Sequence, residues 1–173
     1  YFGITLDLGV AYYLLAVFLL TGMVNAVNLT DGIDGLSSSV TAVVAVFFSV
    51  CAFHLVRPEL AVLPATVVGG TVGFLMYNFY PAKIFMGDTG SLTIGGIIAV
   101  IAVIIHKELL LPILCGVFLA ENLSVILQVQ YFKWGKRKGR MQRLFKRTPI
   151  HDAFRTLPEQ LVPGCYYFKK EHV

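Results

Sequence analysis

Five long apolar stretches constrain the fold of this chain more than any other feature of its sequence. They cover residues 8–27, 37–55, 60–79, 92–105 and 109–129. Because a helix needs roughly 20 apolar residues to cross the hydrocarbon core of a bilayer, each stretch is a candidate membrane span. The fourth stretch is the shortest, so its helix is expected to be tilted, partly covered by neighbours, or extended through Ser91 and His106.

The composition supports a bilayer as the solvent of this chain. Of its 173 residues, 57% are hydrophobic and 14% are charged, which is unusually apolar for a water-soluble domain. We therefore predict an all-α fold, a polytopic transmembrane helical bundle with about five spanning helices. Cys51 and Cys115 lie inside apolar stretches and Cys165 lies in the polar tail, so neither a disulfide framework nor a redox role is indicated.

Several glycines interrupt the third and fourth apolar stretches. Because glycine has no side chain, it lets two membrane helices approach closely, and packing is the commoner reason for its presence there. The glycines predicted to be packing contacts are Gly69, Gly70, Gly73, Gly95 and Gly96.

The orientation of the chain follows from a cluster of basic residues after the fifth stretch. Lys and Arg in short loops are retained on the cytoplasmic side, so the fifth span is expected to end inside. Counting back through alternating crossings, the loops 28–36 and 80–91 and the segment 130–173 are all cytoplasmic. The basic cluster either marks topology and anionic lipid or attracts a polyphosphate substrate. Its members are Lys133, Lys136, Arg137, Lys138, Arg140, Arg143, Lys146 and Arg147.

The first cytoplasmic loop carries two aspartates, Asp31 and Asp34, each followed directly by a glycine. Glycine lets a backbone approach a ligand closely, and carboxylates at a membrane face bind a metal or accept hydrogen bonds from a ribose or a base. The alternative is a pair of turns between two helices, which the dipeptide Asp-Gly commonly marks. Both interpretations stay open from this loop alone.

The second cytoplasmic loop carries Asp88 between Gly87 and Gly90, just before the fourth apolar stretch. A carboxylate beside free backbone N–H groups and a positive helix end suits a phosphate site with Mg²⁺. The alternative is that Asp88 only caps the helix. Asn78 is a further candidate as an amide that makes hydrogen bonds, and Phe85 as a ring that either stacks on a ligand or packs at the interface.

Polar residues also occur in and after the fifth apolar stretch. Glu121 and Asn122 interrupt it, and an ionisable residue at membrane depth is either functional or paired inside the bundle. His151 follows the basic cluster after Thr148-Pro149-Ile150. A histidine alone is a weak signal, but this one is expected on the same face as the three aspartates.

Four segments together resemble the polyprenyl-phosphate hexose-1-phosphate transferases, and within that superfamily the phospho-N-acetylmuramoyl-pentapeptide-transferase branch. The segments are NLTDGIDGL at 28–36, YPAKIFMGDTGSL at 80–92, LSVILQV at 123–129 and RLFKRTPIH at 143–151. The first two are shared across the superfamily in looser form, whereas the last two are more specific to this branch.

The resemblance implies a Mg²⁺-dependent phosphoglycosyl transferase of peptidoglycan synthesis. It would transfer phospho-N-acetylmuramoyl-pentapeptide from UDP-N-acetylmuramoyl-pentapeptide to undecaprenyl phosphate and release UMP. The enzyme would be a multi-pass protein of the bacterial inner (plasma) membrane, surrounded by membrane lipid, with its active site on the cytoplasmic face. Nucleic acid is not an expected partner, and a homodimer is left open.

The resemblance also implies roles for individual residues. Asp88 would bind the metal, and Asp31, Asp34 and His151 would join it as catalytic residues, with His151 near the diphosphate as the first residue of a triple-histidine motif. The nucleotide or substrate side would be formed by Asn28, Gly32, Ile33, Asn78 and Phe85, with Phe85 stacking on uracil.

This chain departs from the pattern of that family at two points. Where the family has three successive histidines, the chain has His151-Asp152-Ala153. The family has about ten spanning helices and a pair of adjacent aspartates on an earlier loop. Residues 1–173 are therefore expected to be the carboxy-terminal part of a single transmembrane domain.

Two alternative functions remain at the level of sequence. One is a related transferase that uses UDP-N-acetylglucosamine as the donor. The other is a secondary transporter in which Glu121 and the paired aspartates bind coupling ions.

Overall fold

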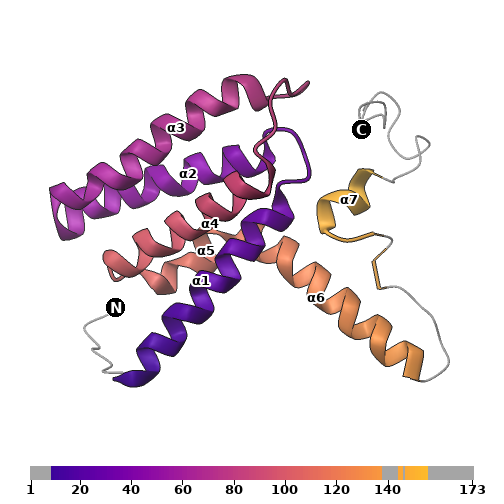
Figure 1. The fold of residues 1–173 in the computed structure, drawn as a ribbon. Helices are drawn as coiled ribbons and strands as arrows, with labels where there is room; N and C mark the ends of the chain where they lie inside the picture. The colour runs from indigo at the N-terminus through magenta and orange to yellow at the C-terminus, as the bar shows by residue number, and fades with distance from the viewer. Residues whose placement is uncertain (1–8, 138–143, 146, 156–173) are drawn as a thin grey trace.

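The computed structural model describes residues 9–137, 144–145 and 147–155, and those residues contain helices and turns but no strand. The predicted all-α fold is therefore confirmed. Figure 1 shows α2 and α3 lying side by side, α1 and α4 beside each other next to them, and α6 leading away from the other helices. The basic residues Lys138, Arg140, Arg143 and Lys146, together with Cys165 and the rest of the tail 156–173, lie outside the described residues.

The helices follow one another with short connections. In chain order they are α1 (Val10–Thr30), α2 (Leu36–Cys51), the π-helical segment η1 (Ala52–Val56), the 3₁₀ turn η2 (Pro58–Ala61), α3 (Val62–Asn78), α4 (Gly87–Ile104), the 3₁₀ turn η3 (Glu108–Leu110), α5 (Leu111–Leu114), α6 (Gly116–Arg137) and α7 (Ile150–Arg155).

Four helical stretches in the described part of the chain are long and apolar enough to cross a membrane. They are Val10–Thr30, Leu36–Val56, Pro58–Asn78 and Gly87–Ile104, and a fifth is added if Glu108–Leu114 and Gly116–Arg137 count as one bent span. This agrees with the predicted number of spans. Large apolar side chains such as Tyr13, Leu14 and Phe18 are at least 70% exposed on the outside of α1, as expected where lipid replaces water as the solvent. The chain is an integral membrane protein.

The fifth span differs from the continuous helix expected over residues 109–129. It is broken at Cys115, whose φ of −93° and ψ of 25° are not helical, and the two parts are bent by 79°. The apolar pattern continues through the bend, so it gives no sign of the break. Gly116, which begins α6, is a weak helix former and favours an interruption at this point.

The helices next to the two motif-bearing loops also extend further than their apolar stretches. α4 begins at Gly87, not near Leu92, because its first turn is polar and is missed when only apolar residues are counted. Asp88 therefore lies inside the first turn of α4, where an acidic side chain is favoured by the helix dipole, and not before the helix. α1 likewise continues to Thr30, so Asn28 lies in its last turn.

The core forms where α1 packs along α4 and α2 packs along α3. Val27, Phe48 and Ile98 are fully buried in this core, together with Phe118 of α6. Cys51 and Cys115 are buried free thiols, in agreement with the expectation that they act as small apolar side chains.

Gly95 makes the close contact between α1 and α4 possible. A Cβ atom at this position would lie 2.7 Å from Cα of Val24 and 2.9 Å from the carbonyl oxygen of Met23. The predicted packing role of Gly95 is confirmed, and Gly96 beside it leaves an ordinary 3.8 Å contact with Val24. The other three glycines have no such neighbour within 4 Å among the described residues, so the expected contact is not seen for Gly69, Gly70 and Gly73.

Candidate active site

Two polar loops meet at one end of the bundle and enclose a cavity of about 180 Å³. One loop connects α1 to α2, and the other connects α3 to α4. The cavity is lined by Asn28, Asp31, Gly32, Ile33, Asp34, Asn78, Phe85, Met86, Gly87 and Asp88. Every site residue predicted from the sequence except His151 is in this set, so the structure brings together side chains that are up to 60 residues apart in the chain.

Asn78 joins the two loops from beneath the cavity. Its Oδ1 accepts hydrogen bonds from the backbone N–H of Gly35 and from Oγ of Ser38, both at 3.0 Å. Its Nδ2 donates to the carbonyl oxygen of Ile84 at 2.9 Å, and the residue is 4% exposed. The amide was expected to make hydrogen bonds, and it does so within the protein, where it fixes the shape of both loops.

Asp34 forms a second connection between the loops. Its Oδ2 accepts a hydrogen bond of 3.0 Å from the backbone N–H of Ala82. Gly35 follows with a φ of 73°, a left-handed conformation that favours glycine, and starts α2. The turn expected from the Asp-Gly dipeptide is thus present here, and it also serves to hold the neighbouring loop.

Asp88 is held by a residue from a different helix. Nδ2 of Asn28 donates to Oδ1 of Asp88 at 3.1 Å and to Oγ of Ser91 at 3.0 Å. The N-cap position of α4 is occupied by Met86, and no side chain caps this helix end. The structure therefore does not support helix capping as the role of Asp88, whose exposed carboxylate lies at the cavity beside a positive helix end.

Asp31 and Asp88 create a concentration of negative charge. Burial, and then the neighbouring carboxylate of Asp88, raise the pKa of Asp31 to about 6. Two carboxylates that repel each other attract a cation, and Mg²⁺ typically takes one or two protein carboxylates and completes its shell with substrate oxygens and water. No group of three or more His, Cys, Asp or Glu side chains in the described residues is arranged to hold a metal. The donor set therefore fits Mg²⁺ shared with a substrate and does not form a complete protein cage.

Phe85 exposes its ring at the cavity. It is 69% exposed, although it lies among the lining residues. The ring is not covered by the described part of the chain, and both interpretations of Phe85, stacking on a ligand and packing at the interface, stay open. An uncovered aromatic face is able to stack on a planar group such as a nucleobase.

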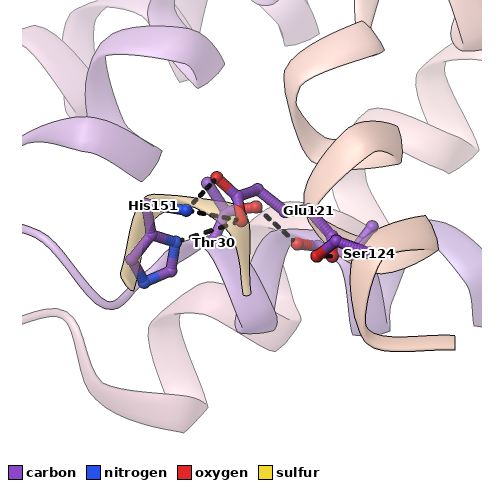
Figure 2. A network of polar contacts seen from close by, with 5 residues as sticks. Thr30, Glu121, Ser124 and His151 are labelled. Atoms are coloured by element: carbon purple, nitrogen blue, oxygen red, sulfur yellow. Dashed lines mark hydrogen bonds and ion pairs between the residues drawn. The ribbon is translucent and has the colours of Figure 1, made fainter. Parts of the chain in front are cut away.

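His151 does not line the cavity but lies directly behind Gly32. A Cβ atom at Gly32 would lie 2.5 Å from Nε2 of His151, and His151 is 9% exposed. Figure 2 shows His151 beside Glu121 of α6, near Thr30 at the end of α1. Of the two interpretations left open for Glu121, the structure shows pairing, since its carboxylate lies 3.2 Å from Nδ1 of His151. A buried acid in an apolar stretch signals that a partner is needed, but the sequence does not say which residue it is.

No role was predicted for Gln128 from the sequence. Its Oε1 accepts hydrogen bonds from the backbone N–H groups of Leu144 at 3.0 Å and Phe145 at 2.8 Å. These bonds anchor the segment that leads to His151. The signal was present, because Gln128 is one of two polar residues, with Ser124, in the apolar segment LSVILQV, but sequence alone did not identify its partners.

A second cavity, of about 400 Å³, lies between α6 and the segment before α7. It is lined by Gln128, Val129, Phe132, Lys133, Arg147, Thr148 and Asp152. Two residues of the basic cluster thus face it, and Arg147 forms an ion pair of 4.0 Å with Asp152 across its wall.

Comparison with known proteins gives a consistent family assignment. A sequence model of the family described as glycosyl transferase family 4 matches residues 1–106. The chain is 50% identical to the phospho-N-acetylmuramoyl-pentapeptide-transferase of Phocaeicola vulgatus, in an alignment covering 91% of this chain and 41% of the relative. It is 52% identical to the protein of that name from Bacteroides thetaiotaomicron, covering 89% and 40%. For that of Porphyromonas gingivalis, identity is 47% and coverage is 84% and 38%. The chain thus spans about two fifths of the length of these relatives.

Proposed function

The chain belongs to glycosyl transferase family 4, and on that basis we propose that its full-length protein transfers phospho-N-acetylmuramoyl-pentapeptide from UDP to undecaprenyl phosphate and releases UMP. The names of the relatives support this donor over others. The reaction would produce the first lipid-linked intermediate of peptidoglycan. A secondary transporter receives no support from these comparisons.

The observation that carries this proposal is the cavity between the α1–α2 and α3–α4 loops. It combines an exposed aromatic ring, Phe85, with the carboxylates of Asp31 and Asp88 at the positive end of α4. A nucleoside diphosphate needs a surface for its base and a site for its phosphates, and this cavity supplies both kinds of group. Phe85 would stack on uracil, and the start of α4 would face the diphosphate.

The reaction breaks one phosphoric anhydride bond and forms another. An oxygen of the lipid phosphate attacks the phosphorus that carries the sugar, and UMP departs with the electron pair of the broken P–O bond. Negative charge accumulates between the two phosphates, so stabilisation by positioned donors dominates catalysis. Mg²⁺ held by Asp88 would offset this charge when bound. Asn28 would keep the Asp88 carboxylate in place through the 3.1 Å hydrogen bond.

The site is proposed to lie on the cytoplasmic face of the bacterial plasma membrane. Lys133, Lys136 and Arg137 form the last turn of α6 or lie next to it, and basic residues near a span end favour the cytoplasmic side. A soluble nucleotide sugar and the phosphate of a membrane lipid meet at this interface. A homodimer is compatible with this function but is not required by it.

The proposed function is tested by a label-transfer assay on the full-length protein in detergent with undecaprenyl phosphate and Mg²⁺. UDP-N-acetylmuramoyl-pentapeptide and UDP-N-acetylglucosamine, each labelled in the sugar part, are supplied in separate reactions. We expect label from the muramoyl donor to enter a butanol-extractable lipid. Transfer from the N-acetylglucosamine donor alone would establish the other transferase, and the absence of a labelled lipid from both donors would refute the proposal.

A further inference from the structure

Glu121 and His151 form a buried pair that joins α6 to α7. The side chain of His151 is 8% exposed and that of Glu121 is 7% exposed. The backbone N–H of His151 donates to the two carboxylate oxygens at 3.2 and 3.3 Å, and Nδ1 lies 3.2 Å from Oε2. Figure 2 shows the carboxylate facing both nitrogens at the start of α7. One carboxylate therefore holds the main chain and the imidazole of the same residue.

The burial of this pair determines which imidazole nitrogen carries hydrogen. A carboxylate removed from water strongly destabilises the folded protein unless it is paired. In the described part of the chain, Nδ1 of His151 has no partner that meets the geometric criteria of a hydrogen bond. Its ion-pair contact with Oε2 of Glu121 therefore offsets the cost of burying this nitrogen. A bare nitrogen lone pair 3.2 Å from a carboxylate oxygen would be repelled. Nδ1 therefore carries hydrogen, and Nε2 is the nitrogen that faces Gly32.

The opposite edge of the imidazole is fixed by a glycine. A Cβ atom at Gly32 would lie 2.5 Å from Nε2 and 3.1 Å from Cε1 of His151, so a larger residue would displace the ring. Gly32 itself lines the cavity between the aspartates. The ring is thus held between the carboxylate of Glu121 on one side and the loop of the candidate active site on the other.

We propose that Glu121 is a positioning residue for the transfer reaction and acts through His151. It fixes the ring and the tautomer of His151 so that Nε2 is presented to the Gly32 edge of the cavity. The proposal rests on the function proposed above. The alternative is a purely structural role, in which Glu121 only connects α6 to α7. In that case, replacing Glu121 lowers kcat by the same factor whether or not the imidazole of His151 is present.

A double-mutant cycle separates these two roles. Turnover and KM for the labelled muramoyl donor are measured for the full-length wild type, Glu121→Gln, His151→Ala and the double variant. We expect Glu121→Gln to lower kcat by at least about tenfold while KM changes less than about threefold. In the His151→Ala background the same substitution should cost less than about twofold, because no ring is left to position. Wild-type kcat in Glu121→Gln, or costs that multiply in the double variant, would overturn the proposal.

Unfolding temperatures provide a second readout that does not depend on turnover. His151→Ala removes the imidazole and leaves the buried carboxylate of Glu121 with only the backbone N–H at position 151, so it should lower the unfolding temperature. Adding Glu121→Gln should then recover part of the loss, because it removes the uncompensated charge. A further loss in the double variant would contradict the pairing.

Two more variants keep the test decisive if Glu121→Gln does not fold. Gly32→Ala leaves Glu121 intact but places a methyl group against Nε2 of His151, so it should lower kcat. In the His151→Ala background, the same substitution should no longer lower kcat. A decrease in kcat that persists in that background refutes the proposal. Ser124→Ala is the matched control, because Ser124 is a buried α6 residue whose hydroxyl bonds to the carbonyl oxygen of Glu121 at 2.6 Å. It should retain wild-type kcat.

The outcome for the wild type distinguishes failure of this inference from failure of the proposed function. If the wild type transfers label from neither donor, the function is wrong and the positioning role falls with it. If the wild type transfers label and the costs in the cycle multiply, the function stands and the positioning role is wrong.

Discussion

Asn28 in the last turn of α1 donates a hydrogen bond of 3.1 Å to Asp88 in the first turn of α4, although the two residues are 60 positions apart in the chain. The bond connects the end of one candidate span to the beginning of another. It also places an amide donor on the carboxylate that is the candidate metal ligand. The position of this carboxylate is therefore set by helix packing and not by the flexibility of a loop.

Replacing Asn28 should weaken the candidate metal site. A hydrogen bond to a charged group contributes about 1.5–3 kcal/mol, so Asn28→Ala is expected to lower kcat/KM by roughly 10- to 100-fold, with the largest effect at low Mg²⁺ concentration. Label transfer measured over a Mg²⁺ titration checks this. Asn25→Ala is the control, because Asn25 donates to Thr21 within α1, and equal losses in the two variants would contradict the prediction.

Asp88→Asn should abolish Mg²⁺-dependent transfer without unfolding the protein. A ligand that binds the folded state at a hundredfold excess over its Kd stabilises it by about 2.7 kcal/mol. We therefore expect Mg²⁺ to raise the unfolding temperature of the wild type in detergent by several degrees, and to leave that of Asp88→Asn unchanged. An equal rise in both proteins would remove Asp88 from the metal site.

The stability of the metal-free protein should depend on pH through Asp31. Burial and the Asp88 carboxylate raise the pKa of Asp31 to about 6, above its value in the unfolded chain. The folded state then holds the proton more tightly, so this group lowers stability as the pH rises from about 4 through 6, and the full penalty is present above that range. Asp31→Asn should raise the unfolding temperature near pH 7.5 in EDTA and give little gain near pH 4. An equal rise in the unfolding temperature at both pH values would contradict the raised pKa of Asp31.

The contact between α1 and α4 should not tolerate a side chain at Gly95. A methyl group there would lie 2.7 Å from the backbone of Val24, and overpacking of this kind costs about 1–3 kcal/mol. Gly95→Ala should lower the unfolding temperature and, since α4 carries Asp88, also reduce transfer. Gly96→Ala is the matched control, because its methyl group would meet Val24 at an ordinary 3.8 Å. An equal decrease in the unfolding temperature of both variants would mean that the change of glycine to alanine in the helix is the cause, and not the close contact with Val24.

Sequence patterns predicted the helices and the loops of this protein well, because both depend on local composition. The apolar length located each span, and the glycine-flanked aspartates located the loops that form the cavity. The pattern did not show the bend at Cys115, since an apolar residue is equally acceptable in a straight and in a bent helix. It also missed the polar first turn of α4, where hydrogen bonding of the backbone outweighs side-chain polarity.

The pairings between distant residues were beyond what one sequence shows. Glu121 was recognised as a residue that needs a partner or a function, but nothing in the chain specified His151, because the contact depends on how α7 packs against α6. Asn78 was expected to make hydrogen bonds, and the structure shows that its partners are Gly35, Ser38 and Ile84. Hydrogen bonding by the Asn78 amide was predictable from its residue type. That its partners lie within the protein could be seen only from the fold.

The contact of His151 with Gly32 has a consequence for how the site is assembled during synthesis. All the residues that line the cavity are present in the chain once α4 has been made. His151 follows only after α6, which is bent by 79° from the segment Glu108–Leu114, has been completed. Since synthesis runs from the amino terminus, the residues of the cavity are made before the imidazole. The growing chain therefore passes through a stage that contains every residue lining the cavity but lacks the ring behind Gly32.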